Sequence, residues 1–485
     1  MNKMCVSMTL ILCLMNLWGC AARAVPEMSG TLAAVTTAFE TEATMEPAAA
    51  HTTEPSTAPA SEPSIAPTTK PTTAPRTEPT TEPTAEPATE PVTQPPEVDL
   101  QVYQYSDMKA MWLSQFDLEG IFRDENSQRD EASYRALMAQ ILDRVKDQGF
   151  NTVFLQIRPY ADSMYPSAVY PMSSYVAGQT GGEVQYDPVE IAVGLAHDRG
   201  LSIHAWINPM RGMEEQEITL VGTEYAIRRW FEDPQLRGKY IVPVNGRWYL
   251  NPAYDEVVDL ICAGAEEALR SYEFDGLHMD DYFYPTTEQS FDAEAYSAYQ
   301  ADGGSLNLAD FRRENLSGLV HRLYSMTHEL GGGRILGISP AGNVDTVVNS
   351  QYADVYRWCG EDGYLDYICP QVYFGLEHGG FDFEKACRTY QSMIRAENVD
   401  LIIGMTFGKA LTGEDKWAGS GKDEWKNNKD VLARCLMTTR ELEHCRGVAV
   451  FCYQYLFDPL TGEQVPETAR EQENFIPVLR EISWN

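Results

Sequence analysis

Residues 274–285, FDGLHMDDYFYP, set the interpretation of the whole chain. The first half of this stretch alternates as a β-strand does, with Leu277 and Met279 on one face and His278 and Asp280 on the other. A strand that buries its apolar face presents the other two side chains at its carboxyl end. In α/β sheets and barrels, that end is where the chemistry lies.

Two acids and three aromatic residues end this stretch. Asp280 and Asp281 are followed by Tyr282, Phe283 and Tyr284, and aromatic faces are what a pyranose ring packs against. The combination is typical of a site that cleaves sugars. The alternative is that the two acids only cap the next segment, because Asp is common at helix N-caps and in turns.

Apolar runs of strand length recur along the chain, separated by helix-like stretches with apolar residues at spacings of three and four. Gly149 and Gly200 stand where a helix should stop, and a strand-like run follows each. Eight strands alternating with helices predict an α/β fold, a (β/α)₈ TIM barrel with long βα loops, rather than a doubly wound sheet. The strand-like runs are 110–113, 152–157, 202–207, 276–279, 335–338, 367–369, 401–405 and 448–452, and the helix-like stretches include 134–148, 188–199, 256–272, 308–330 and 429–444.

Residues 210–251 break this alternation. They follow the third strand and carry Trp230, Trp248 and Tyr249, so we expect an extended loop that lies over the mouth of the barrel.

Polar side chains follow strand after strand, which predicts that they converge on one rim of the barrel, where a substrate sits. Taken one at a time, most of these polar residues can be explained by a structural role instead of substrate binding. His204 is the kind of residue that is often satisfied within a core, and Asn208 and Gln371 can simply end strands. The candidate substrate-binding residues are Arg158, His204, Asn208, Arg211, Trp248, His278, Tyr282, Tyr284, Ser339, Asn343, Gln371, Tyr373 and Tyr453.

The first 24 residues have the pattern of an export signal. The apolar run 6–18 is too short for a permanent transmembrane helix and fits a signal peptide. It ends in Leu-Trp-Gly-Cys, which resembles the bacterial lipobox, although Trp18 stands where a small residue is usual. Residues 1–24 are therefore predicted to be a lipoprotein signal peptide with Cys20 as the lipidated residue, the alternative being a plain signal peptide cut shortly after it.

Residues 25–98 consist almost wholly of Thr, Pro, Glu, Ala and Ser. Such a composition buries too little apolar surface to fold, so we expect a disordered Pro/Thr/Glu-rich linker that extends through stiffness and self-repulsion. The remaining residues, 99–485, number about 390, within the range of one barrel with long loops. They form the predicted catalytic or binding domain, exported and held outside the cytoplasm at the bacterial cell membrane.

Charge narrows the choice of partners. Of the formal net charge of −34, +2 falls on residues 1–24, −9 on 25–98 and −27 on the rest. A domain this acidic repels nucleic acid and anionic lipid, so we exclude nucleic-acid binding and expect membrane contact only through the lipid anchor.

Cysteine usage supports neither a disulfide framework nor a zinc site. Seven of the ten cysteines fall in the domain, an odd number, and no Cys-x-x-Cys occurs. Cys369 and Cys452 lie in apolar runs, where a thiol behaves as a small hydrophobe. No ligand cluster has usable spacing, so no metal or organic cofactor is predicted.

Several separated motifs, in order along residues 110–457, resemble the glycosyl hydrolase-like 10 family. The resemblance implies a (β/α)₈ barrel, usually exported or lipid-anchored, with activity on cell-wall or related glycans. It places the family's acid pair on Asp280 and Asp281, and its arginine and asparagine motifs on Arg158, Asn208 and Arg211. Ala341 departs from the family pattern, since an aromatic residue often follows the Ser-Pro. The motifs are GFNTVFLQIRP (149–159), HAWINPMR (204–211), WYLNP (248–252), FDGLHMDDYFYP, GISP (337–340) and CPQVY (369–373).

A glycosidase usually needs two carboxyl groups that flank the scissile bond. Adjacent strand residues point to opposite faces, so Asp280 and Asp281 share a site only if the strand ends between them. We assign Asp281 as general acid and Asp280 as the anionic partner, which acts as nucleophile or orients a substrate 2-acetamido group. The opposite assignment stays open. Further acids that can serve as the second carboxylate are Asp117, Glu119, Asp345 and Glu377.

The predicted function is hydrolysis of peptidoglycan glycan strands or a related amino-sugar polysaccharide at the cell envelope. Arg158 and Arg211 can bind a substrate carboxylate, such as the lactyl group of muramic acid, although Arg158 can equally brace the barrel against a neighbouring Asp. Two alternatives remain: a non-catalytic glycan-binding surface lipoprotein, and a glycosidase for external plant or host polysaccharide.

Overall fold

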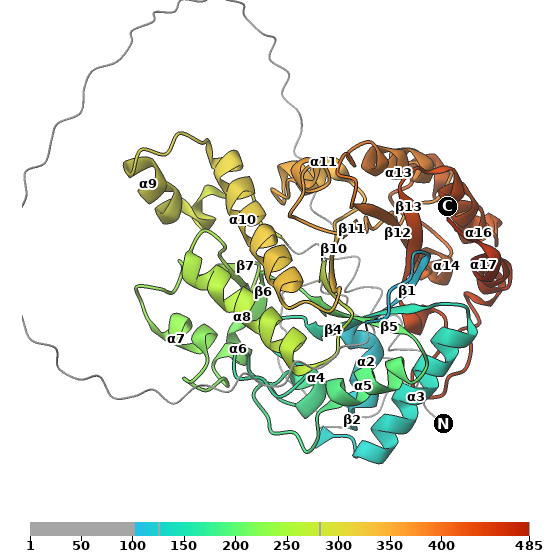
Figure 1. Ribbon diagram of the computed structural model, residues 1–485, viewed down its shortest axis with the longest axis horizontal. Helices are drawn as coiled ribbons and strands as arrows, with labels where there is room; N and C mark the ends of the chain where they lie inside the picture. The colour runs from blue at the N-terminus through green and yellow to red at the C-terminus, as the bar shows by residue number, and fades with distance from the viewer. Residues whose placement is uncertain (1–101, 125–126, 281–282, 485) are drawn as a thin grey trace, which may run out of the picture. The chain divides into compact units, whose positions relative to one another are not determined.

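The computed structural model describes residues 102–124, 127–280 and 283–484. Eight parallel strands within them close into a barrel in the order β1-β13-β12-β11-β10-β9-β5-β4, and helices surround it (Figure 1). The predicted TIM barrel is therefore confirmed. The barrel strands are β1 (Met108–Leu113), β4 (Thr152–Arg158), β5 (Ser202–Ile207), β9 (Gly276–Asp280), β10 (Ile335–Ser339), β11 (Tyr367–Ile368), β12 (Asp400–Thr406) and β13 (Cys445–Phe451).

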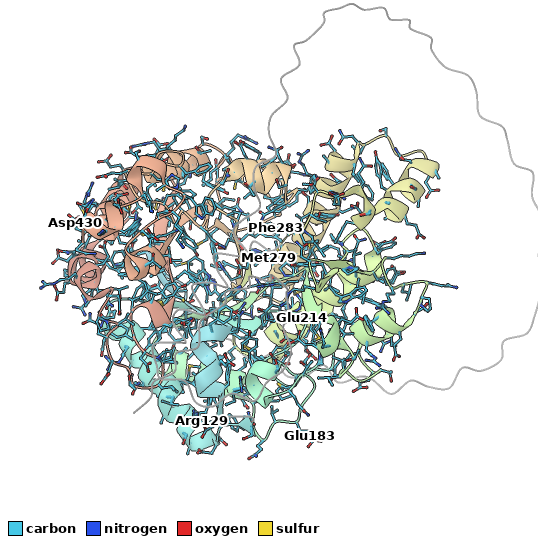
Figure 2. The ribbon with its side chains drawn as sticks, turned by 180° about the vertical axis from the view of Figure 1, so that it is seen from behind. Arg129, Glu183, Glu214, Met279, Phe283 and Asp430 are labelled. Carbon is cyan, nitrogen blue, oxygen red and sulfur yellow. The ribbon has the colours of Figure 1, made fainter. Side chains whose placement is uncertain are left out.

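The barrel strands read as apolar runs because both of their faces are covered. β1, β4, β5 and β9 are buried along their whole length, as expected for parallel strands that have helices on one side and the barrel interior on the other. Figure 2 shows Met279 of β9 near the centre of the domain and Asp430 at its edge.

The surrounding helices begin and end at the residues that the sequence marks. Asp130, Asp187 and Asn307 are side-chain N-caps of α3, α5 and α10, and Gly149 (φ 96°) and Gly200 (φ 62°) take the left-handed conformation just after α3 and α5. The main helices are α2 (Gln115–Phe122), α3 (Glu131–Asp147), α5 (Pro188–His197), α8 (Asp255–Ser271), α10 (Leu308–Glu329), α13 (Phe383–Gln391), α16 (Val431–Thr438) and α17 (Ala469–Glu481).

Shorter elements lie in the loops and toward the edge of the domain. They are the two-stranded β2 (Arg123–Asp124) and β3 (Ser127–Gln128), with α4 (Ser174–Ala177), α9 (Ala293–Ala301), α11 (Val344–Asn349), α12 (Val355–Trp358), α14 (Gly408–Thr412) and α15 (Glu424–Asn427). The stretch predicted as one helix over 429–444 is α16 followed by a single 3₁₀ turn, Thr439–Glu441.

The excursion after β5 has a fold of its own, so the expected extended loop is corrected. It contains a three-stranded antiparallel sheet in the order β6-β8-β7 together with two short helices. Aromatic side chains fill its interior, with Trp230 and Trp248 only 8% and 4% exposed. Its elements are β6 (Arg211–Glu214), α6 (Glu215–Ile218), α7 (Ala226–Glu232), β7 (Ile241–Val244) and β8 (Arg247–Leu250).

A buried ion pair holds the loop that leaves β9 against helix α10. Arg312 and Asp292 are both fully buried and form two hydrogen bonds, of 2.9 and 2.7 Å. Arg312 also donates to the Glu288 carbonyl at 2.6 Å. The guanidinium is thus paired and hydrogen-bonded, as a buried charge requires.

The predictions for residues 1–24 and 25–98, including Cys20, lie outside the described residues. Within the part of the chain that the structure describes, none of the helices combines the length and hydropathy needed to cross a bilayer. The seven cysteines of the domain are all buried and unpaired.

Candidate active site

Asp280 is the last residue of β9 and is 6% exposed. Its Oδ2 accepts from Trp206 Nε1 at 3.1 Å and from Asn208 Nδ2 at 2.9 Å, and its Oδ1 accepts from Gln371 Nε2 at 2.9 Å. Three uncharged N–H groups that converge on one carboxyl group suit its ionised form, which only accepts hydrogen bonds. The arrangement provides a fixed negative charge at the carboxyl end of the barrel.

Two of these donors, Trp206 in β5 and Asn208 just after it, lie on the same face because side chains alternate along a strand. His204, Trp206 and Asn208 succeed one another at every second residue, and β5 pairs with β9 in register with Trp206 opposite His278. Asn208 also accepts from Gln156 Nε2 at 2.8 Å, which orients its amide so that the NH₂ group points to Asp280. The sequence interpretation missed Trp206, although the alternation with His204 and Asn208 was the signal for it.

Gln371 reaches Asp280 from the end of β11. Its Nε2 also lies 3.3 Å from the hydroxyl and from the carbonyl oxygen of Ser339, the last residue of β10. The structure therefore brings together Asp280, Asn208, Gln371 and Ser339 from the predicted set.

His204 and His278 lie inside the barrel, where they are almost fully buried. Trp112 Nε1 donates to His278 Nε2 at 3.2 Å, so the proton of His278 is on Nδ1 and is donated to the Tyr367 hydroxyl at 2.9 Å. The hydroxyl in turn donates to His204 Nδ1 at 3.0 Å. Burial lowers the pKa of His204 to about 4 and the pKa of His278 well below its ordinary value, so both rings are neutral.

The two histidines belong to a layer of side chains beneath Asp280, and their contact with a substrate stays a prediction. Nδ1 of each histidine is hydrogen-bonded to Tyr367, and Nε2 of His278 is hydrogen-bonded to Trp112. Phe154 stacks on His278 with ring centroids 3.9 Å apart. Gly337 leaves room for the layer, since a Cβ there would lie 1.8 Å from the Tyr367 ring. The two rings fill the barrel in the way that layered side chains do in this fold.

Of the two predicted arginines, Arg158 is the last residue of β4 and Arg211 is the first residue of β6, in the excursion after β5. Arg158 is 3% exposed, donates from Nη2 to the Pro209 carbonyl at 2.9 Å and lies over the Tyr170 ring at 4.4 Å. Arg211 lies over the Tyr160 ring at 4.6 Å. Both guanidinium groups are packed on aromatic rings, so in this conformation they brace the rim, and their contact with a substrate carboxylate stays a prediction.

Several predicted contacts are not brought to Asp280. Trp248 packs edge-on against Phe231 within the β6-β8-β7 unit, and Tyr284 packs against Phe291 and Tyr352 at 1% exposure. The remaining three are Asn343, which caps α11; Tyr453, which is buried beside Phe457; and Tyr373, which is half-buried beside Phe451. Asp281 and Tyr282 lie outside the described residues, so their predicted roles stay predictions.

Asp117, one possible second acid, has a structural role instead. It is 1% exposed, accepts from the Ser114 amide and hydroxyl at 2.6 Å each and accepts from the Gln454 amide at 2.7 Å. Burial raises its pKa to about 6, against the opposing effect of these bonds. It completes the capping box of α2, whose N-cap is Ser114, and it ties the end of β1 to the segment just after β13.

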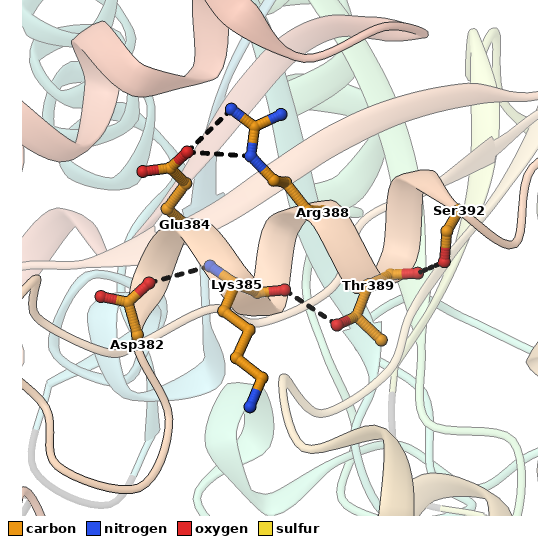
Figure 3. Close-up of a pocket in the computed structure, with 6 residues that line it drawn as sticks. All are labelled: Asp382, Glu384, Lys385, Arg388, Thr389 and Ser392. Atoms are coloured by element: carbon orange, nitrogen blue, oxygen red, sulfur yellow. Dashed lines mark hydrogen bonds and ion pairs between the residues drawn. The ribbon is translucent and has the colours of Figure 1, made fainter.

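The other three candidates are on the surface. Glu119 pairs with Arg123 one turn along α2, Asp345 is exposed in α11, and Glu377 is exposed in the loop after β11. A shallow depression on the outer face of α13 is lined by side chains that mostly bond one another, such as Glu384 with Arg388, and it is not part of the barrel mouth (Figure 3). Among the described residues, no three His, Cys, Asp or Glu side chains gather as a metal site does.

A closed (β/α)₈ barrel with an acid held at the end of its fourth strand is an architecture that glycoside hydrolases can use. The model of the glycosyl hydrolase-like 10 family matches residues 107–418. The chain belongs to that family.

The curated relatives are glycosyl hydrolases by name. The chain is 29% identical to glycosyl hydrolase YngK of Bacillus subtilis over 64% of its own length and 61% of that protein, so it spans less than two thirds of that relative. It is 29% identical to glycosyl hydrolase DigH of Escherichia coli over 68% of its own length and 77% of that protein.

Solved structures share less sequence with it. The glycoside hydrolase domain of PgaB from Bordetella bronchiseptica matches with a TM-score of 0.47 and 14% identity, over 76% of this chain and 99% of that domain. The catalytic domain of β-amylase from Paenibacillus polymyxa matches with a TM-score of 0.48 and 11% identity, over 77% of this chain and 98% of that domain.

Proposed function

We propose that residues 99–485 hydrolyse glycosidic bonds in peptidoglycan glycan strands or a related amino-sugar polysaccharide. The observation that carries the proposal is the position of Asp280, a buried carboxyl group at the carboxyl end of β9 with three N–H donors directed at it. Family membership and the names of the curated relatives support it.

In this proposal Asp280 stays ionised and stabilises the positive charge that develops on the sugar ring in the transition state. It acts either as nucleophile or by orienting a 2-acetamido group. Asp280 is the last residue of β9, and Asp281 follows it directly in the sequence. We assign to Asp281 the proton that the leaving oxygen takes up.

The activity test uses purified residues 99–485 with denuded peptidoglycan and a panel of neutral polysaccharides, with products analysed by mass spectrometry. We expect new reducing ends from the amino-sugar chains, lost in Asp280→Asn and Asp281→Asn and kept in Asp345→Asn, which changes an exposed acid on α11. Binding without new reducing ends, unchanged in the first two variants, overturns the enzyme proposal in favour of a glycan-binding protein. Cleavage of neutral polymers alone favours an external polysaccharide as substrate.

The proposed location is the outer face of the bacterial cell membrane, with Cys20 lipidated and residues 25–98 acting as a tether. The support is the lipobox-like ending of the signal and the Pro-rich composition that follows it. Growth with a labelled fatty acid tests it. We expect Cys20→Ala to abolish labelling of the protein and Cys13→Ala, within the apolar run, to leave it unchanged, whereas labelling that persists in Cys20→Ala contradicts the anchor.

A further inference from the structure

Two large aromatic side chains are exposed on the βα loops that follow β11 and β12. Phe381 is 40% exposed just before α13, and Trp417 is 65% exposed between α14 and α15. In a (β/α)₈ barrel, loops that follow strands lie at the carboxyl end, the same end as Asp280. Exposed apolar side chains are ordinary when scattered over a surface, so what matters is how these two are held and what lies beside them.

The loop that carries Trp417 is held by a buried acid. Asp415 is 2% exposed, accepts from the Trp417 backbone amide at 3.1 Å and forms an ion pair with Lys409 at 3.3 Å. The loop also bonds the β11 loop, where the Gly379 amide donates to the Ala418 carbonyl at 2.8 Å. The backbone of Trp417 is therefore fixed, while its indole ring stays open to solvent.

The loop that carries Phe381 is fixed by a buried acid as well. Glu424, at the start of α15, is 2% exposed and accepts from the amides of Leu376 and Glu377 at 3.1 and 3.0 Å. Burial raises the pKa of Glu424, and these two amides oppose that effect. The two loops thus form one braced unit at the rim.

This unit is continuous with the candidate active site. Gln371, which donates to Asp280, lies three residues before Phe374, and the Phe374 ring is stacked on Phe381 with centroids 5.3 Å apart and 22° between the planes. Gly342 makes space for Phe374, because a Cβ there would lie 2.9 Å from the ring. The segment from Gln371 to Phe381 therefore connects the partner of Asp280 to a stacked pair of aromatic rings at the exposed edge.

We infer that Trp417 and Phe381 form an outlying subsite that binds pyranose units of the glycan at a distance from the bond that is cleaved. The inference rests on the proposed function for its ligand, and it adds a preference for long chains. An open indole or phenyl face held on a rigid loop offers the C–H face of a sugar ring a contact with little loss of conformational entropy. A short oligosaccharide bound only around Asp280 does not reach the subsite, whereas a long chain does.

The test compares Trp417→Ala and Phe381→Ala with wild type on N-acetylglucosamine oligomers of graded length and on denuded glycan strands. We expect KM for the longest chains to rise about 5- to 10-fold, the size of one aromatic stacking contact, with kcat unchanged and with no effect on the shortest oligomer that is cleaved. Trp417→Tyr should retain most of the affinity. The control is Met437→Ala, which removes another exposed apolar side chain (47%) from the end of α16 next to β13, at the opposite end of the barrel.

Equal KM values for wild type and Trp417→Ala at every chain length overturn the subsite, as does an equal loss at every length. If wild type cleaves no glycan, the proposed function fails, and the subsite is then decided by binding of long oligomers measured calorimetrically. Weaker binding by Trp417→Ala than by Met437→Ala supports the subsite in that case, and equal binding by the two variants refutes it.

Discussion

The side-chain amide of Gln371 donates to Oδ1 of Asp280 at 2.9 Å and so connects β11 to β9 across the intervening β10. An amide at this position offers a proton to the carboxylate without adding a charge. The identity of residue 371 therefore controls the electrostatics of Asp280 as well as its orientation.

Gln371→Glu is expected to make activity depend on pH in a new way. Two adjacent carboxylates repel, and the pair is favourable only when it shares one proton. Activity should fall at least about 100-fold at neutral pH, as when a group that stabilises the transition state is lost, and should recover partly toward pH 5. Gln371→Met, which has neither donor nor charge, should lose activity by the same factor at every pH in initial-rate assays. Parallel pH profiles for the two variants would contradict this role.

Trp206→Phe is expected to lower kcat about 10- to 100-fold while the ring still fills its place. The substitution removes one donor to a charged acceptor, a bond of about 1.5 to 3 kcal/mol. Trp112→Phe is the matched control, because it removes an indole donor to His278 one layer below. That variant should lose thermal stability and retain a kcat close to wild type. If the two variants lose the same kcat, the effect of Trp206 is structural.

Arg312→Met is expected to destabilise the domain by about 3 to 5 kcal/mol, because it leaves Asp292 buried without its partner. Arg313→Met, on the next residue of α10, breaks a partly exposed pair with Asp310 and should cost less than about 1 kcal/mol. Urea unfolding of both variants measures the difference. Similar midpoints for the two would show that the buried pair adds no more than the exposed one.

Glu471→Gln is expected to stabilise the domain above neutral pH. Burial raises the pKa of Glu471 from 4.5 to about 7, while its carboxylate accepts from the Leu432 amide at 2.5 Å. A raised folded-state pKa gives stability that is full below pH 4.5 and is lost as pH rises to about 7. The variant does not titrate, so its advantage over wild type should grow across this window to at most about 3 kcal/mol.

Unfolding in urea at pH 5, 6, 7 and 8 measures that advantage. Glu473→Gln is the control, since Glu473 lies on the same helix, is exposed and pairs with Arg470. An advantage of Glu471→Gln that is the same at every pH would show that the carboxyl group does not titrate in this range.

Local alternation and turn chemistry were enough to predict the barrel. Residues 202–207 were predicted as a strand with the bounds that β5 has, and Gly149 and Gly200 end helices as expected. The sheet in residues 210–251 was not predicted. Its three strands are short and pair only with one another, so it is their pairing in the fold that identifies them and not an alternating pattern in the sequence.

Sequence order also predicted which polar side chains come together at the end of the barrel, whereas their roles stay predictions. Asp280, Asn208 and Gln371 follow strands, and parallel strands bring their ends together, so sequence order alone gathers them. The sequence does not show at which level along the barrel axis each side chain lies. His204 and His278 were candidates for the rim, and they lie one layer below it. Trp206, which the sequence interpretation missed, directs its N–H at Asp280.

The layer formed by Trp112, Phe154, His204, Tyr367 and His278 has a consequence for the electric field of the site. When both histidines are neutral the layer has no net charge, and its protons run in one direction, from His278 through Tyr367 to His204. A carboxylate above such an apolar, ordered floor is poorly screened from below. The layer supplies no counter-charge, so the negative charge of Asp280 stays uncompensated from below and remains available to the cationic transition state that we propose at the open end.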